Sequence, residues 1–167
     1  SDVYKRQILR RRGTSWSFET LELDKARLSK DVESLIQLWL SRLNKREAKV
    51  LSACAVLGDG FDLGVLEELS HLDGHLFFQV LDSLENHNLV RREQGANFAF
   101  THKWAQRVLY KRMPTKKRKA LHAKAAEIIE KLYPDRWFDL AEHCLKGEVK
   151  AKAYKYSLLA GRRARES

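Results

Sequence analysis

Three glycines between residues 58 and 64 suggest a possible phosphate-binding site, because glycine-rich loops can bind phosphate. They are Gly58, Gly60 and Gly64. A phosphate-binding loop follows a strand and ends in a lysine and a serine or threonine that meet the phosphates and the metal ion. The sequence predicts no strand before Gly58, and no such pair follows Gly64. We therefore interpret Gly58 as the end of a helix and the other glycines as parts of a turn.

A second group could bind a metal ion: His71, His75 and His87, together with Cys54. His71 and His75 are four residues apart, but Asp73 between them is predicted to begin a new helix. The pair therefore does not lie on one helical face, as metal ligands at this spacing would. We interpret the three histidines as surface residues.

The two cysteines, Cys54 and Cys144, lie within apolar stripes and show no disulfide or zinc spacing. Buried, unpaired cysteines are typical of core positions in a reducing cytosol. The sequence contains no Ser/His/Asp or Cys/His arrangement and no conspicuous carboxylate pair. Nothing in the chain therefore favours catalysis.

His102 carries the functional hypothesis. Leu89–Glu93 and Asn97–Phe100 flank a Gln94-Gly95 turn, which predicts a β-hairpin. Thr101 is predicted to end the second strand and cap a helix, so that His102 is the first helical residue. The positive end of the helix dipole lowers the pKa of a histidine there and attracts anions. A neutral imidazole could then donate to a nucleotide phosphate on an adjacent domain; the alternative is an ordinary polar residue beside a cap.

The elements around this hairpin are helices with apolar stripes. Helices are predicted from Ser29, from a capping box at Asn44 and Glu47, and after caps at Asp62 and Asp73. Residues 8–13 are predicted to be coil, Trp16–Phe18 to be extended, and Phe61 to lie in a turn. The order of helices followed by a hairpin predicts a winged helix, three helices plus a β-hairpin, over residues 29–113.

After Met113-Pro114 the sequence predicts helices alone. Thr115 is predicted to cap a helix that ends near Leu132, and a helix pair follows on either side of Gly147. Small residues on the pair are typical of antiparallel helical repeats. We therefore predict a mostly α protein, with a tetratricopeptide-like repeat region at 114–167 that is expected to be truncated, because one pair does not bury its faces.

The formal net charge of +10 is unevenly distributed, because no Asp or Glu occurs from Gln94 to Ala126. Such a basic run indicates a solvated face, an acidic partner domain, nucleic acid or a membrane. The helix after Asp73 has no Lys or Arg and exposes Asp82 and Glu85, which disfavours entry into a DNA groove. No apolar run approaches a membrane span and no signal peptide is visible, so we expect a cytoplasmic protein without a membrane or nucleic-acid partner.

The first seven residues, SDVYKRQ, resemble the translation of a sequencing-library tag. We expect residues 1–7 to be an artefact and exclude them from the fold argument.

Several short motifs, taken in order, resemble the segment that follows the ATPase core in bacterial STAND regulators (signal-transduction NTPases with numerous domains). This family includes maltose-activator-type transcription factors and kinase- or cyclase-linked ATPases. The motifs are Trp16–Phe18, Arg42-Leu43, Val50-Leu51, Ala55-Val56-Leu57-Gly58, Phe61-Asp62, Leu81, Leu84, Leu89-Val90, Phe98-Ala99-Phe100-Thr101-His102, Val108, Tyr110, Leu121-His122, Leu140-Ala141-Glu142-His143 and Ala160-Gly161.

The resemblance implies a role for His102. In eukaryotic relatives the same strand end carries a Met-His-Asp motif whose histidine contacts the ADP β-phosphate. His102 matches that histidine, while Thr101 and Lys103 replace the Met and the Asp. Residues 8–28 would be a linker or the end of the ATPase region, and the Walker segments would lie before residue 8.

The function implied is that of a non-catalytic regulatory segment. It would couple the nucleotide state of an upstream ATPase core to helical repeats that bind a protein partner or effector. No cofactor is expected on this segment itself, and ATP or ADP would belong to the longer parent protein. The alternatives are a DNA-binding winged-helix regulator and a tetratricopeptide-like adaptor between proteins.

Overall fold

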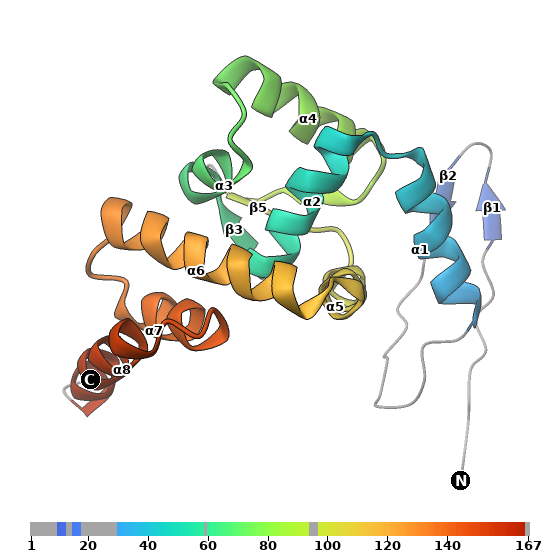
Figure 1. Cartoon of the computed structure of the whole chain (residues 1–167). Coiled ribbons are helices and arrows are strands. Elements are labelled where there is room, and N and C mark those ends of the chain that lie inside the picture. The colour runs from blue at the N-terminus through green and yellow to red at the C-terminus, as the bar shows by residue number, and fades with distance from the viewer. Residues whose placement is uncertain (1–9, 13–14, 18–29, 59, 94–96, 166–167) are drawn as a thin grey trace, which may run out of the picture. The chain divides into compact units, whose positions relative to one another are not determined.

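The computed structural model describes residues 10–12, 15–17, 30–58, 60–93 and 97–165 (Figure 1). This part of the chain is mostly helical and contains a small antiparallel sheet of three strands. It divides into two compact units, Ser1–Leu35 and Ile36–Ser167. No helix within the described residues has the length and apolar character that a membrane crossing needs.

The first unit contains a short antiparallel hairpin, β1 (Arg10–Arg12) and β2 (Ser15–Ser17), in which Arg11 is opposite Trp16. The prediction of coil for residues 8–13 was therefore wrong at Arg10–Arg12. The prediction of an extended segment at Trp16 was confirmed, whereas Phe18 lies outside the described residues.

The first two helices are α1 (Lys30–Arg42) and α2 (Lys45–Leu57), and local sequence signals mark both ends of α2. The Oδ1 atom of Asn44 accepts from the amide of Glu47 at 3.0 Å, and the Glu47 carboxylate accepts from the amide of Asn44 at 2.8 Å. The predicted capping box is thus confirmed. Gly58 ends α2 with φ 112°, a conformation that favours glycine. Glu47 also accepts from Ser83 at 2.6 Å, which ties α2 to α4.

The sheet consists of β3 (Gly60–Asp62), β4 (Val90–Arg92) and β5 (Asn97–Phe100), in the order β3-β5-β4. The hairpin of β4 and β5 was predicted, but β3 was not. Phe61 lies opposite Phe98 in the ladder, and its ring stacks on Phe98 at 6.4 Å and meets Phe100 edge-on at 6.2 Å. The prediction of a turn at Phe61 was wrong because pairing with β5 buries the ring in an extended strand.

Helices α3 (Leu63–Ser70) and α4 (Gly74–Asn86) follow β3. The predicted cap at Asp62 is confirmed, since its Oδ1 accepts from the amide of Val65 at 3.0 Å. Asp73 occupies the cap position of α4, but its side chain makes no capping hydrogen bond. The apolar stripe of α4 faces the core, where Phe77 and Leu84 are fully buried.

The remaining helices are α5 (Lys103–Arg112), α6 (Thr115–Leu132), α7 (Trp137–Lys146) and α8 (Lys150–Arg165). The prediction that Thr115 caps α6 was wrong, because Pro114 holds the cap position. Thr115 is the first helical residue, and its hydroxyl instead accepts from Arg118 at 3.2 Å. The two cysteines are free and buried, as predicted.

Helices α6 and α7 come into close contact at Gly147. A Cβ atom at this position would lie 2.6 Å from the backbone nitrogen of Ala123 and 2.9 Å from its Cα. No rotamer change relieves a clash with backbone, so helix α6 can reach the end of α7 only because residue 147 is a glycine.

We expect Gly147→Ala to lower the free energy of unfolding by about 1–3 kcal/mol, the usual cost of overpacking. The matched control is Gly161→Ala within α8, where a Cβ would meet nothing within 4 Å. That change is expected to be neutral or to stabilise by up to about 1 kcal/mol through helix propensity. Denaturant unfolding of both variants checks the difference, and equal stabilities would contradict the close packing of α6 and α7.

Candidate functional site

His102 lies at the joint between β5 and α5. The amide of Thr101 still donates to the carbonyl of Leu89 at 3.1 Å, so Thr101 continues the hairpin. The hydroxyl of Thr101 is buried without a hydrogen-bond partner in the structure. His102 itself, with φ −129° and ψ 117°, occupies the cap position of α5, and its carbonyl accepts from the amide of Ala105 at 2.9 Å. The prediction that Thr101 caps α5 and that His102 is helical was therefore wrong by one residue.

The imidazole of His102 is part of a stack of three rings. It stacks on Trp104 with 5.7 Å between ring centroids and 16° between planes. Trp104 in turn stacks on Trp39 of α1 at 5.6 Å and 23°. Stacked aromatic side chains at these distances stabilise each other beyond simple burial. The orientation of the His102 ring is thus fixed by its neighbours, although its side chain makes no capping hydrogen bond.

The electrostatics of His102 favour the neutral imidazole. Burial, and then the charge of Arg91, lower the pKa of His102 below its ordinary value. The direction agrees with the sequence-based prediction, while the physical causes found here are burial and Arg91. The first turn of α5 contains no acidic residue, and Lys103 is its first residue. Arg91 itself is paired with Glu93 at 2.9 Å. A neutral N–H donor at the start of a helix is suited to an anionic oxygen.

Arg92 connects the hairpin to α4. It donates to Asp82 at 2.7 Å and to Glu85 at 3.1 Å, and its guanidinium lies over the ring of Phe98 at 5.3 Å. The two acidic side chains of α4 that were predicted to face solvent are therefore paired with an arginine from β4. Helix α4 itself carries no Lys or Arg.

The structure does not bring the histidines and the cysteine of the proposed metal group together. His71, His75 and His87 are exposed, whereas Cys54 is fully buried and burial raises the pKa of its thiol. His71 contacts the ammonium of Lys124, and His75 lies 3.4 Å from the amide of Gln79. Among the described residues, no three His, Cys, Asp or Glu side chains are grouped so as to hold a metal ion.

A buried histidine pair was missed by the sequence argument. His122 on α6 and His143 on α7 are 1% and 6% exposed, and their Nδ1 atoms are 2.9 Å apart. The Nε2 atom of His122 lies 2.8 Å from the hydroxyl of Tyr110 on α5. Both histidines fall on apolar stripes, next to Ala125 and Leu140, and this position was the available signal. Together with Tyr110, the histidine pair therefore connects the three helices α5, α6 and α7.

The short Nδ1–Nδ1 distance constrains the protons of this pair. One ring must donate and the other accept, so a second proton between the two nitrogens would break the hydrogen bond. Burial first, and then the charges of His143 and Lys146, lower the pKa of His122 to about 3. Burial also lowers the pKa of His143, although the charges of Glu142 and Asp139 act in the opposite direction. The lowered pKa values favour two neutral imidazoles, and protonation of both rings would break the Nδ1–Nδ1 hydrogen bond.

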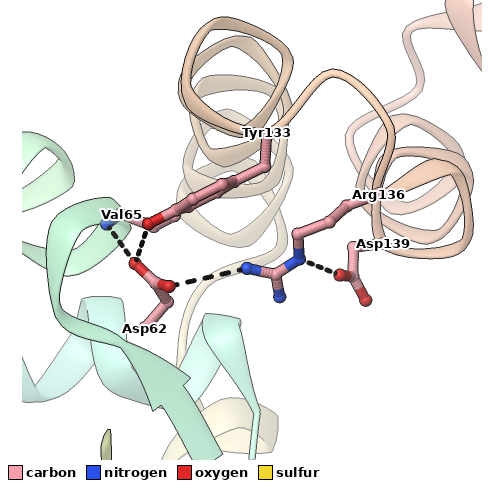
Figure 2. Close-up of polar contacts among 5 residues, drawn as sticks. All are labelled: Asp62, Val65, Tyr133, Arg136 and Asp139. Carbon is pink, nitrogen blue, oxygen red and sulfur yellow. Dashed lines mark hydrogen bonds and ion pairs between the residues drawn. The ribbon is translucent and has the colours of Figure 1, made fainter. Parts of the chain in front are cut away.

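A second polar cluster joins α3 to the later helices (Figure 2). The Oδ1 atom of Asp62, which caps α3, also accepts from the hydroxyl of Tyr133 at 3.2 Å. Its Oδ2 atom lies 3.7 Å from Arg136, whose Nε donates to Asp139 of α7 at 2.6 Å. The guanidinium of Arg136 lies over the ring of Tyr133 at 5.2 Å. One carboxylate therefore connects the start of α3, the end of α6 and the start of α7.

A pocket of about 160 Å³ opens between α1, α2, α5 and α6, with Leu51 and Leu109 in its wall and Lys117 at its rim. Pockets for drug-sized ligands and cofactors typically measure about 300–1,000 Å³. This pocket is smaller than a complete nucleotide requires, and His102 is not among the residues that line it.

Comparison with known proteins identified no relative of the chain. No protein-family model, no curated protein and no solved structure matches the chain.

Proposed function

We propose that this chain is the regulatory segment of a STAND-type ATPase signalling protein of the cytoplasm. The segment carries out no catalysis and couples the nucleotide state of an upstream ATPase core to the helices after Pro114. The observation that carries the proposal is the placement of His102: a neutral, ring-stacked imidazole at the joint between β5 and α5, beside Arg91 and Lys103.

The arrangement of elements supports this proposal. We take the order α2, β3, α3, α4, β4, β5, with β5 central in the sheet, as a winged helix. We take α6, α7 and α8 as the beginning of a helical repeat. These are the two parts that the resemblance to STAND regulators implies for the region after the ATPase core.

In the proposed mechanism His102 donates its imidazole N–H to a phosphate oxygen of ADP bound by the core. The charge of Arg91, which is paired with Glu93 at 2.9 Å, adds attraction for the phosphate at this position. The bound nucleotide supplies the signal, and its hydrolysis belongs to the core. His102 then holds the segment against the core in the ADP state, and the segment is released in the ATP state.

The rest of the segment passes this movement on. The stack of His102, Trp104 and Trp39 fixes α5 to α1, and Gln106 of α5 donates to the carbonyl of Ala55 in α2 at 2.7 Å. The Asp62 cluster and the contact at Gly147 then hold α6 and α7 to α3. These contacts hold the helices together as one body, so a displacement at His102 also moves the helical region.

Experiment can distinguish the proposed function from two alternatives, DNA binding and an adaptor role between proteins. DNA binding requires cations near the groove, but α4 has none and its Asp82 and Glu85 are paired with Arg92. Salt-dependent binding of a DNA duplex would favour that function. Full activity of the parent protein without any ATPase core would favour an adaptor between proteins.

Hydrogen exchange in the full-length parent tests the proposal. With ADP bound, the amides at the start of α5 are expected to exchange more slowly than with a non-hydrolysable ATP analogue. Equal exchange in the two nucleotide states would overturn the proposed coupling.

A further inference from the structure

Exposed large apolar side chains are concentrated on the last two helices of the described chain. Four of them lie there: Phe138 is 58% exposed, Leu145 61%, Tyr154 71% and Leu158 46%. Phe138 and Leu145 are seven residues apart on α7, and Tyr154 and Leu158 are four apart on α8, so each pair lies on one helical face. Clustered apolar exposure of this kind marks an interaction surface more often than scattered single residues do.

Helix α8 has two apolar faces. Its inner face consists of Ala153, Tyr156 and Ala160, which are all buried. Its outer face, which we define as Ala151, Tyr154, Leu158 and Gly161, repeats at three- and four-residue spacing and is exposed along its whole length. A surface helix needs one apolar face for its own core, so the second face can receive a helix from outside the described residues.

The shape of the outer face fits a helix. Ala151 and Gly161 are small and lie on either side of the larger Tyr154 and Leu158, and nothing lies within 4 Å of a Cβ at Gly161. Small residues at the two ends allow a second helix backbone to approach closely, while the tyrosine and leucine enter its grooves.

The charge of α8 indicates the chemistry of that second helix. The helix carries Lys150, Lys152, Lys155, Arg162, Arg163 and Arg165 and contains no Asp or Glu. Lys152 is paired with Glu130 of α6 at 2.6 Å, on the inner side. Arg162 and Lys155, which are seven residues apart and exposed, border the outer face on one side, where the Lys155 ammonium lies 5.0 Å from the ring of Tyr156. A partner that covers Tyr154 and Leu158 therefore meets positive charge at its edge.

We propose that the outer face of α8 binds an amphipathic helix of a partner protein, with an apolar stripe against Tyr154 and Leu158 and acidic residues opposite Lys155 and Arg162. In the parent protein, binding of this helix is the input signal to the helical region; this role as input rests on the proposed function. Binding itself depends only on α8 and does not require a nucleotide.

The test measures binding of labelled synthetic helical peptides to the full 167-residue chain by fluorescence anisotropy. The first peptide has leucines at three- and four-residue spacing flanked by glutamates; the second has the same leucines flanked by lysines. The glutamate peptide is expected to bind, more weakly at high salt, and the lysine peptide to bind at least about tenfold more weakly, a difference of roughly 1.4 kcal/mol. Equal binding of both peptides, or none of the glutamate peptide, would overturn the proposal.

Two sets of variants locate the site. Leu158→Asp is expected to weaken binding of the glutamate peptide at least about tenfold. Leu38→Asp on α1 is the matched control, because Leu38 is equally exposed at 46%, and it is expected to leave binding unchanged. The double variant Lys155→Glu with Arg162→Glu is expected to reverse the preference toward the lysine peptide. Circular dichroism confirms that each variant retains its helices, and the charge reversal keeps the test valid if Leu158→Asp fails to fold.

Other occupants give distinguishable results, and each contradicts the proposal. A dimer of the chain that Leu158→Asp dissociates would identify a second copy as the occupant. Binding to phosphatidylserine vesicles without binding to the glutamate peptide would identify a membrane surface. If the peptide binds as expected while ADP and ATP give equal exchange in the parent, the surface stands and the proposed nucleotide coupling fails.

Discussion

Acidification from about pH 7 to pH 4 is expected to destabilise the chain by roughly 3 kcal/mol through His122 alone, at about 1.4 kcal/mol for each unit of pKa difference. The pKa of His122 is lowered from 6.5 to about 3 in the fold. Between these values the unfolded chain binds a proton that the folded chain does not. Stability is therefore fully present above pH 6.5 and is lost as the pH falls toward 3.

The groups around the pair keep this direction. Lys146 and Arg118 add positive charge near His122, and the nearby carboxylate of Glu142 offsets only part of the effect. Protonation of both rings would also place a proton on each Nδ1 atom and break the hydrogen bond that joins α6 and α7. Acid is thus expected to loosen the packing between these two helices.

Denaturant unfolding over a series of pH values measures this effect. The double variant His122→Gln with His143→Gln keeps amide hydrogen-bonding groups at both positions, and we expect its stability to depend much less on pH. His87→Gln, at an exposed histidine, is the control and should retain the wild-type slope. If the double variant does not fold, imidazole titration of the wild type by NMR decides, because two rings that titrate near 6.5 would contradict the account.

His102→Ala in the full-length parent is expected to accelerate ADP release and raise output without effector by roughly ten- to a hundredfold. The reason is the loss of one charge-assisted hydrogen bond, worth about 1.5–3 kcal/mol, from the ADP state. The fold is expected to survive, because the His102 side chain does not cap α5 and Gln106 and buried Val108 still anchor that helix.

A second substitution separates the hydrogen bond from the ring stack. His102→Phe keeps an aromatic ring on Trp104 but removes the N–H donor, so it should release ADP as fast as His102→Ala does. His87→Ala, at the end of α4, serves as the control and should behave as wild type. ADP retention restored by phenylalanine would mean that stacking, and not donation to phosphate, is the role of residue 102.

Features that depend on a few neighbouring residues were predictable from the sequence. The capping box of Asn44 and Glu47, the cap at Asp62 and the left-handed Gly58 all involve residues within one turn of a helix. Such signals are complete within the sequence window that contains them. The hairpin of β4 and β5 was predictable for the same reason, because its strands lie only a few residues apart in the sequence.

Features that depend on distant segments were not predictable. Phe61 forms a strand only because β5, about 37 residues later, pairs with it, a register that no local pattern contains. Thr101 does not cap α5 because its amide remains bonded to Leu89 across the hairpin. His122 and His143 are brought together by the packing of two helices, and their spacing in the sequence carries no signal of it. His102 was chosen as a candidate site from the sequence, while its ring stack and the effect of Arg91 on its pKa depend on tertiary structure.

The most direct test of the central claim is residue-resolved hydrogen exchange over β5 and α5 in the full-length parent, with ADP and with a non-hydrolysable ATP analogue. The claim is that the segment is held to the core through His102 when ADP is bound. The account predicts that amides from His102 to Gln106 exchange at least about tenfold more slowly with ADP, and that His102→Ala abolishes the difference. Identical exchange over these residues in both states, with nucleotide bound in each, would contradict it.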